Sequence, residues 1–292
     1  GRPWDPGLIE QAPMGTISAL VPLLDENRNR VQEGLRQLAN TGRPGLQALY
    51  RLARVEADSI TAETVSFQIA PRLNSAGRMG DPMDSYNLLT TDSQEEASAL
   101  TQKLESLNMD RRAITEETYT LANSMVEEMN KLPSVIVVSD ERFLRGVAGL
   151  IAGRLVDKYR RPAIVIAIEG ELSVASGRSI PEFNILAAIE SCEHLLVRFG
   201  GHSQAAGLTM ATESIPQLKS HLANYNPGTL EINDLVRQVD IDAVIGLDEL
   251  EETMMREINV IEAYDLANAR PALGSMEGEV LVPYQIGRER QH

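Results

Sequence analysis

The sequence is short of cysteine, of long apolar runs and of positive charge. Its single cysteine, Cys192, rules out an internal disulfide framework and fits a reducing cytoplasm. There is no apolar run of about 18 residues and no signal-peptide pattern, so neither a membrane span nor a secretory leader is indicated. Lys and Arg number 27 against 42 Asp and Glu, so we do not expect a uniformly basic nucleic-acid-binding surface.

Length and composition indicate a globular protein of one to three domains. The chain has 292 residues, of which 43% are hydrophobic, so it can build substantial cores. Its acidity is uneven: residues 227–292 carry 14 acidic and 5 basic side chains, whereas residues 141–202 carry 7 acidic and 8 basic ones. The centre can therefore present local basic sites. The first residue is Gly1 rather than Met, and we expect the chain to be a fragment of a longer protein.

Motifs for metal, nucleotide or nucleophile chemistry are missing as well. No Asp-His-His occurs, the single Asp-x-Asp at residues 240–242 has no histidine near it in the sequence, and the four histidines are scattered. Neither the Gly-x-x-x-x-Gly-Lys phosphate loop nor the Gly-x-Ser-x-Gly elbow is present. The residue patterns therefore support no catalytic centre within this chain.

The apolar pattern divides the chain into four regions. Residues 14–24 form a short apolar run that we interpret as a strand end and loop. Residues 25–130 have helical periodicity, with helices over 46–53 and 61–69, a loop over 70–82, and a long helix capped by Asp92 with Glu95 as its reciprocal partner. Residues 131–226 alternate strands (134–138, 163–168, 172–176, 207–210) with helices (146–159, 184–197, 215–223), which predicts an α/β layer fold. Residues 227–292 predict strands at 239–244, 278–282 and 284–286 and a helix at 247–261.

The most particular stretch of the chain is Phe199-Gly-Gly-His-Ser-Gln-Ala-Ala-Gly207. Gly200 and Gly201 follow a predicted helix, so one of them can take the left-handed conformation that ends helices. The stretch is then either a tight helix-to-strand turn with a packed histidine or a loop that faces a ligand.

Polar residues on predicted loops and strand ends form a candidate anion site. Guanidinium groups contact phosphate bidentately, and serine hydroxyls with backbone N–H groups complete such sites. A strand end is also where α/β sheets tend to bind ligands. Each arginine could instead be an ordinary surface charge or ion pair. The candidates are Arg72, Asn74, Arg78, Ser176, Arg178, Ser179 and His202.

Five stretches, in this order, resemble the RecJ family of single-stranded-DNA-specific exonucleases, within the DHH phosphoesterase superfamily. They are spread over most of the chain. The stretches are Gly15-Thr-Ile-Ser-Ala-Leu-Val-Pro-Leu23, Ala70-Pro-Arg-Leu-Asn-Ser-Ala-Gly-Arg-Met79, Gly146-Val-Ala-Gly-Leu-Ile-Ala-Gly-Arg-Leu155, Ser176-Gly-Arg-Ser-Ile180 and the glycine stretch 199–207.

The resemblance implies an α/β fold with a division into parts. Residues 1–24 would be the tail of a DHH domain, 25–130 a helical connector, 131–226 a DHHA1 substrate-binding domain, and 227–292 the start of an incomplete OB-fold domain. In this family the DHH domain holds two Mn²⁺ or Mg²⁺ ions that promote phosphodiester hydrolysis. The DHHA1 domain grips the 5′ end of the strand, and the OB fold binds single-stranded DNA.

The resemblance also implies roles for individual residues. Ser176 and Arg178 would hold the terminal phosphate and Arg78 a nearby backbone phosphate, while His202 and the Gly200-Gly201 backbone would face the scissile nucleotide. The expected protein is a cytoplasmic 5′→3′ exonuclease of DNA repair and recombination. Its expected partners are single-stranded DNA, a single-stranded-DNA-binding protein and a helicase. This chain would be mainly its substrate-binding part, inactive alone and with no metal bound.

Three departures from the family pattern leave other functions open. Ala19 stands where the family has a metal-binding Asp, Leu144 stands where it often has His, and residues 262–271 have lost both glycines of a family stretch. A non-catalytic nucleic-acid-binding or scaffold relative would show such an alanine. A phosphodiesterase of short oligonucleotides or cyclic dinucleotides is a further alternative, against which the loop at 70–79 and the OB-like segment argue.

Overall fold

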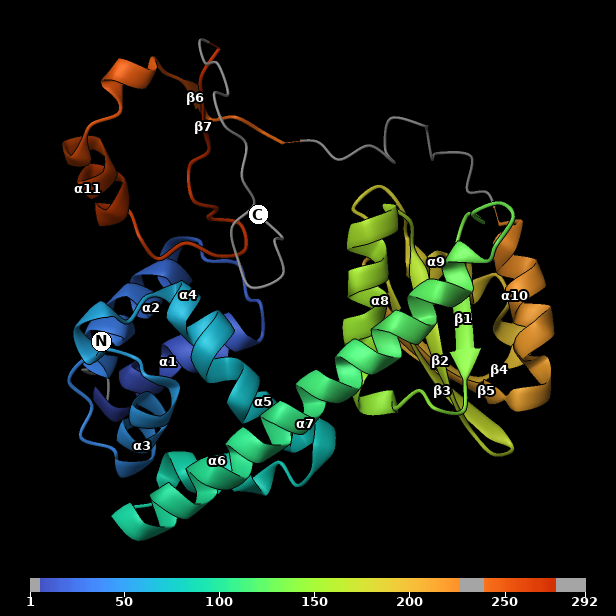
Figure 1. The fold of residues 1–292 in the computed structure, drawn as a ribbon, viewed down its shortest axis with the longest axis horizontal. Helices are drawn as coiled ribbons and strands as arrows, with labels where there is room; N and C mark the ends of the chain where they lie inside the picture. The colour runs from blue at the N-terminus through green and yellow to red at the C-terminus, as the bar shows by residue number, and fades with distance from the viewer. Residues whose placement is uncertain (1–5, 226–238, 277–292) are drawn as a thin grey trace. The chain divides into compact units, whose positions relative to one another are not determined.

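The computed structural model describes residues 6–225 and 239–276, which divide into two compact units (Figure 1). Among the described residues, one unit comprises 6–42, 49–70 and 239–276, and the other comprises 43–48 and 71–225. Within the described residues, no helix combines the length and the apolar character that crossing a membrane requires.

The first unit is a helical bundle with a small β element. Its core includes the fully buried side chains Ile17, Leu23, Val31, Leu38 and Leu49. The helical part consists of α1 (Pro6–Ser18), α2 (Asp25–Leu38), the second half of α3 (Pro44–Ala53), η1 (Ala57–Ser59), α4 (Ala62–Thr64) and the π-helical turn η2 (Val65–Ile69).

The interpretation of residues 14–24 as a strand end is wrong, because α1 continues to Ser18. A strand needs a neighbour for its backbone N–H and C=O groups, whereas a helix pairs its own. No described strand pairs with this segment. Met14 and Ile17 are instead buried from the helix.

Residues 239–276 belong to the same unit and contain less strand than expected. The strand predicted at 239–244 is reduced to β6 (Ala243–Val244), which pairs in parallel with β7 (Leu273–Gly274). The predicted helix 247–261 is divided into η6 (Leu247–Glu249) and α11 (Glu252–Val260). The strands predicted at 278–282 and 284–286 lie outside the described residues. The OB-like domain therefore stays a prediction.

The prediction of a loop at 70–82 is wrong, because residues 70–79 form the helix α5 (Ala70–Met79). Its Pro71 cannot donate a backbone hydrogen bond, yet it stands two residues after η2 ends. A π-helical turn changes the helical register and can accommodate the proline ring without ending the helix. Ser75 then donates to the carbonyl oxygen of Leu104 at 3.2 Å, which ties α5 to a longer helix.

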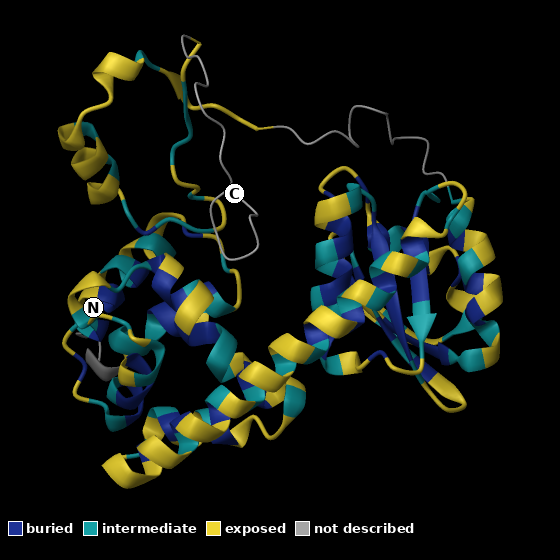
Figure 2. Ribbon diagram, viewed as in Figure 1, coloured by how far each residue is buried: buried dark blue, intermediate teal, exposed yellow. Residues whose placement is uncertain are grey.

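That longer helix is α7 (Gln94–Glu127), which spans 34 residues and follows the short α6 (Met83–Thr90). The predicted cap is one residue off: Ser93, not Asp92, accepts a hydrogen bond from the backbone of Glu96. Much of α7 is exposed, with buried residues confined to a narrow stripe (Figure 2).

The second unit also contains a five-stranded sheet in the order β1-β2-β3-β5-β4. β1 and β2 are parallel and joined by α8 (Arg145–Tyr159), while the other neighbouring strands are antiparallel. This confirms the predicted α/β character. The strands are β1 (Ile136–Asp140), β2 (Ala163–Glu169), β3 (Leu172–Arg178), β4 (Leu196–His202) and β5 (Ala205–Ala211).

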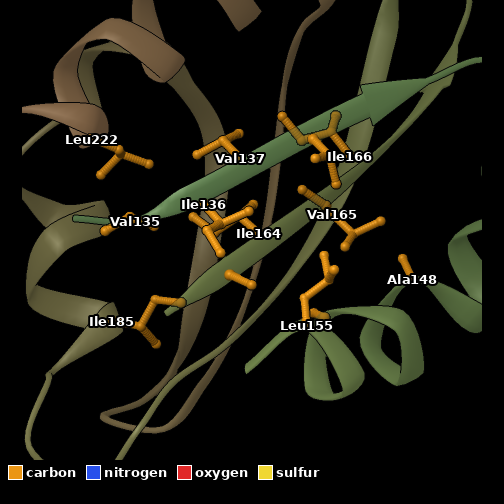
Figure 3. Close-up of a cluster of buried hydrophobic side chains, with 14 of the residues drawn as sticks. Val135, Ile136, Val137, Ala148, Leu155, Ile164, Val165, Ile166, Ile185 and Leu222 are labelled. Carbon is orange, nitrogen blue, oxygen red and sulfur yellow. The ribbon is translucent and has the colours of Figure 1, made fainter. Parts of the chain in front are cut away.

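The core of the sheet lies where the predicted apolar strands meet the helices (Figure 3). Ile136, Ile164 and Ile166 are fully buried, together with Leu155 of α8 and Leu222 of α10 (Ile215–Ala223). Burial on both faces explains why β1 and β2 are apolar along their length. The remaining short helices of the domain are α9 (Ile185–Glu190), η3 (Glu193–Leu195) and η4 (Thr212–Ser214).

The helix predicted at 184–197 is too long: α9 ends at Glu190, and β4 begins at Leu196. Short apolar runs such as Leu195-Leu196-Val197 are compatible with the periodicity of a helix and with that of a strand. The residue pattern alone therefore does not distinguish the two there. Pairing with β5 decides the outcome. Gly200 and Gly201 consequently lie inside a strand and do not form the expected helix-ending turn.

Candidate functional site

The sheet register brings four of the predicted site residues onto one face. Across β3, β5 and β4, Ser176 is opposite Gly207, which is opposite Gly200. One row further, Arg178 is opposite Ala205, which is opposite His202. Directly opposed residues share a face, as do residues two apart in a strand. Ser176, Arg178, Gly200 and His202 therefore lie on the same face.

The outer part of this face is an open glycine surface, defined by Gly200, Gly207 and His202, all of which are exposed. Glycine has no side chain, so another molecule can approach the backbone closely. β4 is also the edge strand of the described sheet, so part of its backbone N–H groups have no partner within the sheet. This surface can therefore accept a flat or chain-like ligand.

Hydrogen bonds hold the β4–β5 hairpin in place beside the end of β3. The backbone N–H of Ser179 donates to the carbonyl oxygen of Gln204 at 3.0 Å, and that of Ile185 donates to Ser203 at 2.9 Å. The hydroxyl of Ser179 donates to the carbonyl oxygen of Phe183 at 2.7 Å, so it has an internal partner. His202 is exposed, and its Nδ1 accepts from the Gln204 backbone at 3.3 Å.

Two arginines meet at the first turns of α8. Arg78 of α5 donates from Nη1 to the carbonyl oxygen of Gly146 at 3.1 Å. The guanidinium of Arg178 packs against Gly149 so closely that a Cβ there would lie 2.8 Å from Nη2. Gly146 and Gly149 are one turn apart on the same side of the helix. A Cβ on Gly146 would lie 2.3 Å from the carbonyl oxygen of Arg78, so these glycines let the backbone of Arg78 and the guanidinium of Arg178 approach α8.

The charges at this place are not balanced by acidic groups. Among the described residues, none forms a salt bridge with Arg78 or Arg178, whereas nearby Arg142 and Arg154 pair with Asp140 and Glu116. Burial lowers the pKa of Arg178, and the positive charge of Arg78 lowers it further. Burial likewise lowers the pKa of Arg78. Two neighbouring cations without a carboxylate favour the binding of an anion.

The structure does not bring Arg72 to this pair. Residues 74 and 78 lie four positions apart on α5 and share a side of the helix, but residue 72 lies elsewhere around it. Arg72 forms a bidentate ion pair with Glu105 of α7, at 2.6 and 3.3 Å. Asn74 is exposed on the side that carries Arg78. A helix in place of the expected loop is the reason for this separation.

Two further arginines near the site were missed from the sequence. Arg198 precedes Gly200 by two residues in β4, so it lies on the same face, and its Nε donates to Thr209 at 3.1 Å. Strand alternation could have revealed it, but a helix was predicted there. Arg111 lies on α7, and its pKa is lowered by burial and by the charge of Arg78. No local pattern distinguishes Arg111 from Arg112.

The residues present do not fit a metal centre of the kind that the family resemblance implies. Across residues 6–225 and 239–276, no three His, Cys, Asp or Glu side chains are grouped so that they could hold an ion. Ala19, at the position of the expected Asp, has a methyl side chain without a donor atom.

Comparison with known proteins identifies one domain and a set of relatives. The model of the DHHA1 domain matches residues 132–226. The chain is 35% identical to the single-stranded-DNA-specific exonuclease RecJ of Bacillus subtilis over 288 residues, which are 98% of this chain and 36% of that protein. It is 32% identical to RecJ of Thermus thermophilus over 89% of this chain and 37% of that protein.

Solved structures agree with this relationship. A crystal structure of Thermus thermophilus RecJ in complex with Mg²⁺ superposes with a TM-score of 0.82 at 30% identity, covering 92% of this chain and 42% of that one. A structure of exonuclease RecJ bound to manganese gives a TM-score of 0.66 at 30% identity, covering 80% and 60%. The chain spans little more than a third of the length of the curated relatives it matches. It is thus a homologue of one portion of the RecJ exonucleases, and it contains a DHHA1 domain.

Proposed function

We propose that this chain is the substrate-binding part of a RecJ-like single-stranded-DNA-specific 5′→3′ exonuclease. In this proposal Ser176 and Arg178 hold the 5′-terminal phosphate, and Arg78 holds the neighbouring backbone phosphate. The first nucleotide then lies over the glycine surface against the Gly200-Gly201 backbone and His202. The observation that carries the proposal is the meeting of two arginines without acidic partners at the first turns of α8, beside an open strand edge.

Three physical features favour a phosphate at this place. A guanidinium donates two parallel hydrogen bonds to a phosphate, and such charge-assisted bonds are stronger than neutral ones. The N-cap residue of α8, Leu144, makes no side-chain cap, although its carbonyl oxygen accepts from the backbones of Val147 and Ala148. An anion can therefore accept hydrogen bonds from the N–H groups that precede these two. The glycine surface admits the sugar and backbone without a steric clash. Because these features are local, the net negative charge of the whole chain does not oppose the proposed phosphate site.

Comparing two ends of the same DNA tests this proposal. The chain should bind a 5′-phosphorylated single strand about tenfold more tightly than the 5′-hydroxyl strand, because one charge-assisted hydrogen bond contributes roughly 1.5–3 kcal/mol. Fluorescence anisotropy with both strands measures the ratio, and affinity should weaken with added salt. Equal affinity for the two strands would show that the site is not a terminal-phosphate site.

The close packing of Gly149 against Arg178 yields a sharper prediction. Gly149→Ala should stabilise α8 by about 0.5–1 kcal/mol, because alanine favours helix interiors. Its Cβ would also displace the Arg178 guanidinium, which lies 2.8 Å away. Affinity for the 5′-phosphorylated strand should therefore fall several-fold while the melting temperature rises or stays unchanged.

Gly153→Ala provides the matched control for that substitution. It lies one turn later in α8, where a Cβ would have open space. It should give the same gain in helix stability and leave the affinity for DNA unchanged. Similar binding by the two variants would contradict the placement of Arg178.

A non-catalytic nucleic-acid-binding relative is the second candidate, and Ala19 favours it. The described residues supply no donor set for two metal ions, so we assign binding rather than hydrolysis to this chain alone. Incubating the chain with Mn²⁺ and an end-labelled single strand tests this assignment. Release of mononucleotides, abolished by Arg178→Ala, would overturn it.

A further inference from the structure

The first observation is the position of Arg111 along α7. Glu116 of α7 pairs with Arg154 of α8 at 2.6 Å, and further along Glu127 pairs with Lys158 at 3.0 Å. The two helices therefore pass each other in the same direction, as Figure 1 shows. Arg111 precedes Glu116 by about 7 Å of helix, toward the end of α8 where Arg78 contacts Gly146.

The second observation is that Arg111 has a polar but no acidic partner. Its guanidinium donates from Nη2 to Asn108 Oδ1 at 2.9 Å, one turn earlier in α7. Its Nε is buried without a hydrogen-bond partner in the described part of the chain. No described carboxylate forms a salt bridge with it, although α7 itself carries many glutamates. A partly desolvated cation in this condition gains free energy when an anion approaches.

The third observation is the order of the three arginines. Arg78 and Arg178 contact the first turns of α8 at Gly146 and Gly149, and Arg111 lies on the part of α7 that runs toward the same end of α8. In agreement with this placement, the charge of Arg78 lowers the pKa of Arg111 and of Arg178, and the charge of Arg112 also lowers that of Arg111. The strand β3 and the helices α5 and α7 thus each contribute one guanidinium to this region.

We propose that Arg111 binds, together with Arg78, the first internucleotide phosphate of the strand whose 5′ end Arg178 holds. This inference rests on the proposed function and extends it from one phosphate to two. Arg111 then acts as a substrate-positioning residue: it sets the direction in which the strand leaves the terminal site. A ligand with a single phosphate gains nothing from Arg111, whereas a ligand with two phosphates does.

The test compares thymidine 5′-monophosphate with 5′-phosphorylated dithymidine as competitors of a labelled 5′-phosphorylated strand. Arg111→Ala should lower the affinity for the dinucleotide about tenfold and leave the affinity for the mononucleotide unchanged. On longer strands it should also reduce the salt slope by about 0.7, as loss of one phosphate contact predicts. Arg112→Ala removes a positive charge from the next position, which is exposed. This variant should leave the affinity for both ligands unchanged. Arg111→Gln, which keeps a donor for Asn108, should reproduce the alanine result if the charge is what matters.

The outcomes separate the two proposals. Equal weakening of both competitors by Arg111→Ala, or no weakening of either, would overturn the role of Arg111. An equal effect of Arg112→Ala would reduce that role to general charge attraction and overturn it too. Arg178→Ala should weaken both competitors, and its failure to do so would refute the terminal-phosphate site itself, whatever Arg111 does.

Discussion

Arg178→Ala should lower the affinity of the chain for 5′-phosphorylated single strands by about tenfold or more. The guanidinium lies on the face of β3 that carries Ser176 and packs against Gly149 of α8. Under the proposed function, its removal eliminates at least one charge-assisted hydrogen bond to the terminal phosphate, which contributes roughly 1.5–3 kcal/mol. Affinity for the 5′-hydroxyl strand should change much less. Equilibrium titration of both strands measures the two effects together.

Two further variants distinguish phosphate recognition from general attraction. Arg142→Ala removes a positive charge from the same domain, but Arg142 is already paired with Asp140 at 2.7 Å, so the preference for the phosphorylated strand should persist. Arg178→Lys should recover only part of the affinity, because an ammonium lacks the planar fork of the guanidinium. Full recovery by lysine, or an equal loss in Arg142→Ala, would argue against a bidentate contact.

Gly201→Ala should destabilise the α/β domain by about 3 kcal/mol and lower its melting temperature by roughly 10 °C. Gly201 has a φ of +149°, which side-chain-bearing residues rarely adopt. A Cβ there would lie 2.3 Å from the carbonyl oxygen of Ala205 and 2.6 Å from the Cα of Ala206, both parts of the paired strand β5. Backbone cannot move aside as a flexible side chain can. Thermal unfolding followed by circular dichroism tests the expectation.

The neighbouring glycine is the control for that variant. A Cβ on Gly200 would have nothing within 4 Å, so Gly200→Ala should change stability by no more than about 0.5 kcal/mol. Unchanged melting of Gly201→Ala would mean that the hairpin does not require a glycine there. Because Ser179 and Ile185 bond to the hairpin backbone, we also expect Gly201→Ala to weaken DNA binding.

The sheet and its central helix could be predicted because their signals are local. The apolar runs that predicted strands at 134–138 and 163–168 correspond to β1 and β2, since strands buried on both faces are apolar throughout. The helix predicted at 146–159 differs from α8 by one residue. Its glycines suggested nothing about Arg78 and Arg178, because that close approach depends on elements distant in sequence.

Prolines and glycines misled the prediction where tertiary structure overrides local preference. Pro71 and Gly77 predicted a loop, but the π turn before Pro71 and the packing of Ser75 on α7 maintain a helix. Gly200 and Gly201 predicted the end of a helix, but pairing with β5 makes them strand residues. The first error placed Arg72 with Arg78, and the second concealed Arg198.

The sequence by itself determined the α/β class of residues 131–226, the resemblance to RecJ, and the types of side chain that a phosphate site would use. Periodicity and motif spacing are properties of short segments, so they can be seen before folding is known. Only the tertiary structure decided which arginines pair with a carboxylate and which have no acidic partner among the described residues. Arg72 meets Glu105 because α5 packs on α7, whereas Arg78 and Arg178 both reach α8 because glycines there leave room for the Arg78 backbone and the Arg178 guanidinium. Charge balance depends on distances between segments far apart in the chain, and folding alone sets those distances.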